Sequence, residues 1–429
     1  MDEKIYQSYL NILKEELVPA LGCTEPIAIA YGAATAKEAF GGIPEHMDVF
    51  CSGNIIKNVK SVTVPNSEGM RGIEAAAVLG AVGGCAQEKL EVLKAITPQH
   101  REKARELLAQ DFCTCHLQED VENLYIRVEM TGGGHLVKVI LSQKHTQIDY
   151  VEKDGQVLRE GKTREECGKK EDERRLLNVR DILAFADEVK MEEIQEVIGR
   201  QVEMNTAIAR EGLNNPYGAQ VGRTLLAVYG NDVRVRAKAM AAAGSDARMN
   251  GCSLPVIINS GSGNQGITCS LPVVEFAREW KASREKMYRA LVVSNLVAIH
   301  QKKYIGSLSA YCGAVSAACG AGAAITYLYG GDYEAVSRTI TNTIANMGGV
   351  VCDGAKSSCA AKIASSVDAA IMAYTLENAD HCFLPGEGLV REDVEDTIRS
   401  MGYVGRVGMK ETDVTILNLM LEKEADEKE

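Results

Sequence analysis

The chain has 429 residues, of which 46% are hydrophobic and 25% are charged, and its net charge is -12 at pH 7. These values are typical of a soluble globular protein with a large core, and the acidic balance argues against nucleic acid as a partner because phosphates need Lys and Arg for neutralisation. Residues 2–6 are charged and lack the apolar core of a secretory signal, so we expect a cytoplasmic protein.

Residues 1–40 predict two helices with a break between them. Apolar residues recur at helical spacing over 5–17, and an Ala-rich helical run follows over 27–40. Thr24 is the expected N-cap of the second helix. We expect both helices to pack on the main core of the protein.

The break, GCTEP, places Cys23 directly before the second helix. Unsatisfied N–H groups and the positive end of the helix dipole would lower the pKa of a thiol at that position. Such a thiolate can act as a base or a nucleophile. A buried cysteine at a helix entry, without chemistry, is the alternative.

Residues 41–178 predict an α/β subdomain with antiparallel strands. Its expected elements are strands at 49–51 and 61–64, a helix at 72–83, and a hairpin of strands at 124–130 and 136–140. Near its end, residues 152–175 are dense in charge of both signs and predict an exposed excursion or linker.

Residues 179–429 are predominantly helical, with Ala-rich and Gly-rich faces that could support a homodimer. The segment 305–331 carries no charge and is long enough to cross a bilayer. It is built largely from Gly, Ala, Ser and Cys, so a buried helix is the better interpretation and no membrane contact is expected. The predicted fold class is α+β: a mainly helical core with an inserted α/β subdomain.

Three of the thirteen cysteines have a spacing that could form a metal site. Cys352 and Cys359 would lie about 10 Å apart on a straight helix, so a turn at residues 353–354 is needed for their sulfurs to converge. Asp353 could also cap the helix that follows. Cys312 could supply a third thiolate, whereas Cys319 is disfavoured because it lies seven positions later on what looks like one helix.

Three cysteinates with one open position are typical of a catalytic [4Fe–4S] cluster, whereas four are typical of an electron-transfer cluster. The same thiols could hold structural zinc. Buried thiols that only pack in the core are the third alternative, because free Cys is a common core residue.

Two Gly-rich turns are candidate anion sites, because successive backbone N–H groups can hold a carboxylate. Their polar residues are Ser52, Gly53, Asn54 and the nearby Lys57, and Ser262, Asn264 and Gln265. The second turn, at 261–266, also matches GxGxxG. A dinucleotide site would need a helix straight after it and a parallel strand beyond, and Pro272 interrupts early, so we do not favour that interpretation. Plain tight turns are the alternative for both.

Two histidines are notable in the sequence, although none of the seven forms a close metal-ligand pattern. His145 lies near a predicted strand end and could meet a substrate, with a hydrogen-bonded or solvated histidine as the alternative. His300 precedes the uncharged segment and is expected to be a polar residue at a helix end.

Four segments together resemble the L-cysteine desulfidase family, which is related to the α-chain of iron–sulfur L-serine dehydratases. They are LGCTEPIAIAYGAA, CSGNIIKNV, GSGNQG and CDGAKSSCA, and the resemblance covers roughly residues 10–420. It implies cluster thiolates at Cys312, Cys352 and Cys359 and a catalytic cysteine at Cys23. The spacings of 40 and 7 residues between the cluster thiols fit the desulfidase branch.

The resemblance implies a helical iron–sulfur catalytic domain at 179–429, on which the helices of residues 1–40 pack, and [4Fe–4S]-dependent β-elimination from a small L-amino acid. The iron that lacks a protein ligand would act as a Lewis acid on the leaving group. Cys23 would take the α-proton, and the two Gly-rich turns with Lys57 would hold the carboxylate.

L-Cysteine is the preferred substrate, giving pyruvate, ammonia and sulfide, because a thiolate binds iron well. An L-serine dehydratase with the same site is the closest alternative. A structural zinc protein, and a binding or regulatory protein that has lost its chemistry, are the alternatives of other classes.

Overall fold

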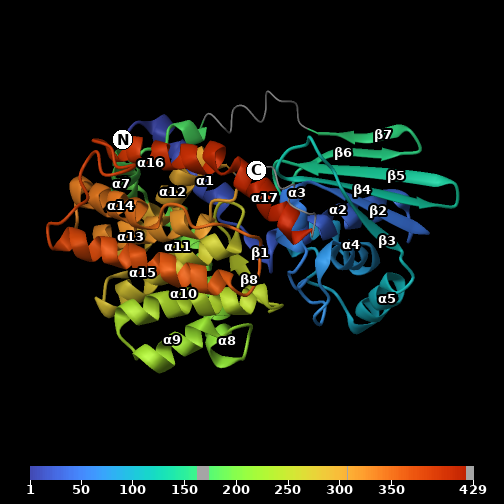
Figure 1. The fold of residues 1–429 in the computed structure, drawn as a ribbon, viewed down its shortest axis with the longest axis horizontal. Coiled ribbons are helices and arrows are strands. Elements are labelled where there is room, and N and C mark those ends of the chain that lie inside the picture. Colours follow the sequence, from blue (N-terminus) through green and yellow to red (C-terminus); the bar gives the residue numbers. More distant parts are fainter. Residues whose placement is uncertain (162–172, 307, 422–429) are drawn as a thin grey trace, which may run out of the picture.

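The computed structural model describes residues 1–161, 173–306 and 308–421. A helical part and a six-stranded sheet lie side by side, with a two-stranded sheet between them (Figure 1). The predicted α+β class with a mainly helical core is therefore confirmed. Part of the charged segment 152–175, residues 162–172, lies outside the described residues.

The two N-terminal helices divide between the two parts. Helix α1 (Glu3–Glu16) begins after Asp2, whose carboxylate accepts from the backbone N–H of Lys4 at 2.9 Å, and it packs against the helical part. Helix α2 (Thr24–Phe40) packs instead on the large sheet and on α4 (Gly72–Gly83). The two-stranded sheet pairs β1 (Pro19–Leu21) with β8 (Pro255–Ile257) in antiparallel fashion, so the segment before α2 is anchored to the helical part.

The large sheet has the strand order β3-β2-β4-β5-β6-β7. Its strands are β2 (His46–Cys51), β3 (Cys113–Leu117), β4 (Tyr125–Gly132), β5 (His135–Ser142), β6 (Ile148–Lys153) and β7 (Gln156–Glu160). β2 and β3 are parallel, and the other neighbours are antiparallel. The predicted hairpin is present, with Gly132 opposite His135.

One expectation for this part was wrong, and another held only for its exposed character. Residues 61–64 form no strand but only an isolated bridge between Thr63 and Arg71, because the chain turns back at once through a tight loop. The start of the charged segment is not a linker: β6 and β7 form a further hairpin over 148–160, and its charged side chains are accommodated because β7 is exposed at the sheet edge.

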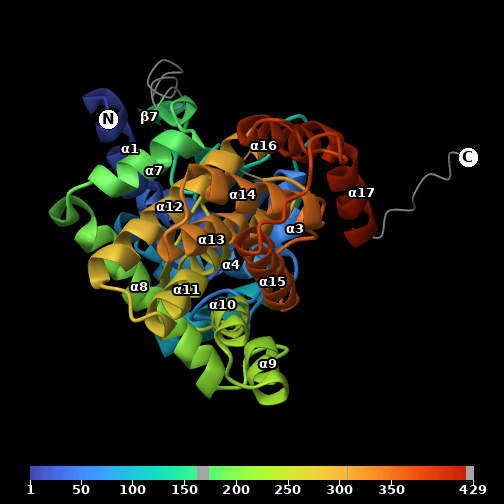
Figure 2. The same ribbon diagram turned by 90° about the vertical axis from the view of Figure 1, so that its left-hand side faces the viewer.

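The remaining elements complete the two parts. Around the sheet they are α3 (Gly53–Val59), the 3-10 helix η1 (Ala86–Glu91) and α5 (Pro98–Leu108). In the helical part they are α7 (Val179–Glu188), α8 (Met191–Asn214), α9 (Val221–Tyr229), α10 (Val233–Met249), α11 (Gly263–Glu279), α12 (Arg284–Ile305), α13 (Gly313–Tyr329), α14 (Tyr333–Met347), α15 (Cys359–Asn378), α16 (Val394–Tyr403), the π-helix η2 (Val404–Gly408) and α17 (Lys410–Met420). Helix α17 packs on α3 and so reaches across to the other part (Figures 1 and 2).

The uncharged segment 305–331 is not one helix, because α12 ends at Ile305 and α13 begins only at Gly313. Helix α13 packs on α11, α12, α14 and α15, and it lies at the centre of the bundle in Figure 2. Small residues allow this close packing: a Cβ at Gly320 would overlap the carbonyl of Ser294 on α12. Among the described residues, no helix combines the length and apolar character needed to span a membrane.

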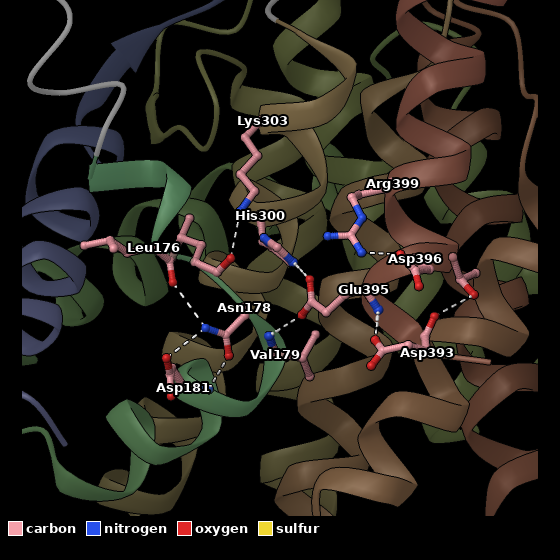
Figure 3. A network of polar contacts seen from close by, with 12 residues as sticks. Leu176, Asn178, Val179, Asp181, His300, Lys303, Asp393, Glu395, Asp396 and Arg399 are labelled. Carbon is pink, nitrogen blue, oxygen red and sulfur yellow. Dashed lines mark hydrogen bonds and ion pairs between the residues drawn. The ribbon is translucent and has the colours of Figure 1, made fainter. Parts of the chain in front are cut away.

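A buried polar network connects helices α7, α12 and α16 (Figure 3). His300 lies inside α12, not at a helix end as expected, and its Nε2 is 2.7 Å from Glu395 Oε2 at the start of α16. Glu395 also accepts from the backbone N–H of Val179 at 2.7 Å, where α7 begins. Burial lowers the pKa of His300, although Glu395 acts to raise it. The histidine is therefore an internal link between three helices.

Candidate active site

Cys23 lies at the N-cap of α2, one residue earlier than the cap we expected, and is 2% exposed. Its Sγ donates to Glu25 Oε2 at 3.0 Å. Burial raises the pKa of the Cys23 thiol well above its ordinary value, the carboxylate of Glu25 acts in the same direction, and Arg248 opposes them. The expected lowering of this pKa is wrong, because the loss of water on burial outweighs the effect of the helix N-terminus.

Glu25 is a site residue that the sequence analysis missed, although it stands in the GCTEP segment. Its buried carboxylate accepts from the Thr24 hydroxyl at 3.1 Å and from Asn58 Nδ2 at 3.2 Å, and His145 Nε2 is 3.8 Å from Oε1. Burial acts to raise the pKa of Glu25, but His145 and the Cys23 thiol outweigh it and lower the pKa to about 2. Cys23 therefore holds its proton beside an ionised carboxylate.

The segments that carry Cys312 and Cys352 are paired through their backbones. The N–H of Cys312 donates to the carbonyl of Val350 at 2.9 Å, and the N–H of Cys352 donates to the carbonyl of Ala310 at 2.6 Å. Cys312 then caps α13. Two cysteines that are forty positions apart in the sequence thus lie on neighbouring segments, which an isolated antiparallel bridge between Tyr311 and Val351 joins.

The turn predicted between Cys352 and Cys359 is present, and Cys359 starts α15. Gly354 has φ +93°, and a Cβ there would overlap the carbonyl of Lys57, so this position requires glycine. Asp353, the candidate cap of α15, does not occupy that position. Its carboxylate pairs with Lys356 Nζ at 2.5 Å and with Lys362, and Ser358 takes the cap position.

The three thiols lie within electrostatic reach of one another. Burial raises the pKa of Cys312 to about 12, and Cys352 adds to this effect. Burial also raises the pKa of Cys359, again with a contribution from Cys352. The pKa of the buried Lys302 is lowered to about 8 by burial, against the attraction of Cys352 and Cys312. By contrast, Cys319 is fully buried, with its Sγ 3.8 Å from the carbonyl of Ile340, as expected of a packing residue.

The side chains around Cys312, Cys352 and Cys359 have the chemical character needed to hold an anionic, thiolate-bound cluster. Soft sulfur donors come from the N-cap of α13, from the segment before α15 and from the first residue of α15. The charges of Lys302, Lys356 and Lys362 act on these thiols. In the parts of the chain that the structure describes, no three His, Cys, Asp or Glu side chains already form a metal-binding arrangement. The thiols would therefore have to rotate toward a common centre when such a group binds.

The turn at 260–266 lies between the group formed by Cys23, Glu25 and His145 (the Cys23 group) and the start of α13 beside Cys312. A Cβ at Gly261 would lie 3.2 Å from His145 Cε1, which places the turn against that ring. Gln265, four residues after Gly261, contacts the start of α13. A Cβ at Gly313 would lie 2.6 Å from Gln265 Cδ, so the Gln265 amide packs against Gly313, the residue after Cys312. Asn264 Oδ1 and Gln265 Oε1 are buried without a hydrogen-bond partner.

The GxGxxG segment at 261–266 does not form the strand–turn–helix unit of a dinucleotide site. Helix α11 begins directly at Gly263 and runs through Pro272, so the reason first given against a dinucleotide site was wrong. The decisive observation is that β8 pairs only with β1, and antiparallel, so the described residues lack the parallel strand that the motif needs.

The other Gly-rich turn leads into α3 and touches the Cys352 segment. Ser52 Oγ donates to the carbonyl of Asn123 at 2.7 Å, and Asn54 Oδ1 is buried without a partner. Lys57 is 2% exposed, pairs with Asp413 of α17, and lies 3.5 Å from the carbonyl of Cys352. A substrate carboxylate at Lys57 would therefore compete with Asp413.

The sequence matches the serine dehydratase alpha chain over residues 87–418. The chain belongs to the serine dehydratase alpha-chain family. This finding confirms the relationship that the four sequence segments predicted, whereas the choice between cysteine and serine as substrate stays a prediction.

Several bacterial proteins are similar to this chain along nearly their whole length. A "UPF0597 protein" of Lachnoclostridium phytofermentans is 54% identical, over 97% of this chain and 100% of that protein. Proteins with the same description from Treponema denticola and Finegoldia magna are 47% and 46% identical, over 98% and 97% of this chain and 99% and 100% of theirs. Their names state no substrate.

Proposed function

We propose that this member of the serine dehydratase alpha-chain family is an iron–sulfur lyase that eliminates the β-substituent of a small L-amino acid, with L-cysteine as the main substrate. One structural arrangement supports the proposal: the backbone pairing of the segments of Cys312 and Cys352, with Cys359 across the Gly354 turn and with the turn before α11 in contact with both His145 and the start of α13.

Cys312, Cys352 and Cys359 would hold a [4Fe–4S] cluster, and Lys302 and Lys362 would balance its negative charge. When bound, the cluster would supply an iron without a protein ligand, which acts as a Lewis acid on the leaving sulfur or hydroxyl.

Proton removal is assigned to the Cys23 group. The thiol would pass its proton to Glu25, to which it is already hydrogen-bonded, once substrate binding has raised the pKa of that carboxyl, and the resulting thiolate would take the α-proton of the substrate. The electron pair of the broken C–H bond forms the double bond as the β-substituent leaves. The product aminoacrylate then tautomerises and hydrolyses to pyruvate and ammonia. His145, beside Glu25, favours the ionised carboxylate, so the transfer requires this interaction to weaken when the substrate binds.

The test is an anaerobic assay of reconstituted protein with L-cysteine and L-serine in parallel. We expect sulfide and pyruvate in equal amounts from cysteine, at a higher rate than pyruvate from serine, because a soft thiolate binds iron better than a hydroxyl. A higher rate from serine would make the protein an L-serine dehydratase, which the family name favours.

Metal analysis separates this function from a structural zinc role. We expect iron and acid-labile sulfide in the anaerobic protein. Colourless protein with stoichiometric zinc would overturn the iron–sulfur proposal, and an intact cluster without lyase activity on either amino acid would favour a protein that binds without catalysis.

A further inference from the structure

Arg248, near the end of α10, is a buried cation for which the described chain supplies no counter-charge. Its side chain is 2% exposed, it forms no ion pair with a described residue, and its Nε has no hydrogen-bond partner. A buried charge without a partner is costly, so such residues in native proteins pair with a carboxylate or with a bound anion.

A second arginine on the same helix shows the usual arrangement. Arg236 is only partly buried, and its guanidinium pairs with Glu275 at 3.3 Å and with Glu279. For Arg248, no such partner is present among the described residues. Asp246, two positions earlier on α10, accepts from the backbone N–H of Gly222 at 3.1 Å and forms no ion pair with Arg248, whose charge is not among the causes that shift the pKa of Asp246.

The carboxylate of Glu25 is also occupied, because Cys23, Thr24 and Asn58 all donate to it. Neither Asp246 nor Glu25 therefore neutralises Arg248 in the described structure, and an anion from outside the chain is the remaining partner.

The position of Arg248 shows which anion fits. A Cβ at Gly263 would overlap Arg248 Nε, so the guanidinium lies against the first residue of α11, where free backbone N–H groups also favour an anion. The charge of Arg248 acts to lower the pKa of Cys23. Gln265, in the same first turn of α11, packs against Gly313, the residue after Cys312. Gln265 is 7% exposed, and its Oε1 lacks a partner.

We propose that Arg248 binds the α-carboxylate of the substrate, that Gln265 Oε1 accepts from its ammonium group, and that the site selects small α-amino acids with a free carboxylate. Naming an amino acid as the ligand rests on the proposed function. In this arrangement the carboxylate lies at the α11 start, the α-proton faces Cys23, and the β-substituent extends toward Cys312. Lys57, whose ammonium pairs with Asp413, then serves to join α3 to α17.

The test measures binding, without turnover, in the cluster-loaded protein. Two probes are titrated by calorimetry: 3-mercaptopropionate, which has a carboxylate and a thiol, and cysteamine, which has an amine and a thiol. Arg248→Gln should weaken 3-mercaptopropionate binding about ten- to hundredfold, because a charge-assisted pair is lost, and leave cysteamine binding unchanged. Arg248→Lys should weaken 3-mercaptopropionate less, because a point charge remains.

Arg236→Gln is the matched control, because it removes a guanidinium that lies on the same helix but is already paired with Glu275 and Glu279. It should bind both probes as the wild type does. Arg248→Lys keeps the test valid if the Gln variant does not fold. Unchanged binding of 3-mercaptopropionate by a folded Arg248 variant, or no binding by the wild type, would overturn the proposal.

The result is separable from the proposed function. A wild type that makes no pyruvate yet loses 3-mercaptopropionate binding in Arg248→Gln would reject the lyase and keep the carboxylate site. An active wild type whose Arg248→Gln variant keeps both its KM for L-cysteine and its probe binding would reject Arg248 alone. If both proposals hold, the variant raises KM about tenfold or more and changes kcat less.

Discussion

The thiol of Cys23 donates a hydrogen bond to Glu25 Oε2 at 3.0 Å, in an interior where both side chains are almost wholly removed from water. Burial holds the proton on the sulfur, and the low pKa of Glu25 keeps its carboxylate ionised, so the proton reaches Glu25 only if substrate binding raises the pKa of that carboxyl. The pair gives the first prediction.

Glu25→Gln should lower kcat for L-cysteine about a hundredfold or more, because an amide cannot accept the Cys23 proton. Glu38→Gln, an exposed position on the same helix, is the control and should keep wild-type kcat. Steady-state sulfide release measures both. Wild-type kcat in a folded Glu25→Gln protein would remove Glu25 from the proton path.

Serine substitutions at Cys312, Cys352 and Cys359 should each lower the bound iron and acid-labile sulfide by more than half, since each removes one of only three thiolates. Cys319→Ala tests a cysteine of the same helix bundle that only packs, and it should retain the wild-type content. Metal analysis after anaerobic reconstitution gives the result. Equal iron in all four variants would place the cluster elsewhere.

Asp246→Asn should change how stability depends on pH. Burial raises the pKa of Asp246 to about 6, although the N–H groups of Gly222 and Val221 act against this. In the unfolded chain this carboxyl has a pKa of about 3.9, so the folded state binds more protons between these values and the wild type loses stability as the pH rises through them. The variant lacks this loss.

The free energy of unfolding of Asp246→Asn relative to wild type should therefore increase from pH 4 to about pH 6 and stay constant above it. Urea unfolding at a series of pH values measures this difference. A difference that does not change with pH would show that Asp246 has an ordinary pKa.

Glu395→Ala should destabilise the protein by about 2–3 kcal/mol, because it leaves the buried His300 and the N–H of Val179 without their acceptor. The exposed neighbour Glu392→Ala should change stability by less than about 0.5 kcal/mol. Chemical denaturation measures both variants. Equal stabilities would mean that the network in Figure 3 contributes little to folding.

Local patterns predicted a large share of the elements. The helix at 72–83 and the hairpin near residues 132–135 follow from periodicity and turn glycines, and both are present. The same rules failed at residues 61–64 and at β7. There, strand formation depends on whether a partner edge is available, and a single segment does not contain that information.

The sequence by itself determined the α+β class, the family, and which cysteines carry a spacing suited to a shared site. Only the tertiary structure decided that Cys23 is buried as a thiol beside Glu25, that Lys57 is already paired with Asp413, and that Arg248 lacks a counter-charge. The physical reason is that the charge state of a side chain depends on the water it loses and the partners it meets, and folding brings both from distant parts of the chain.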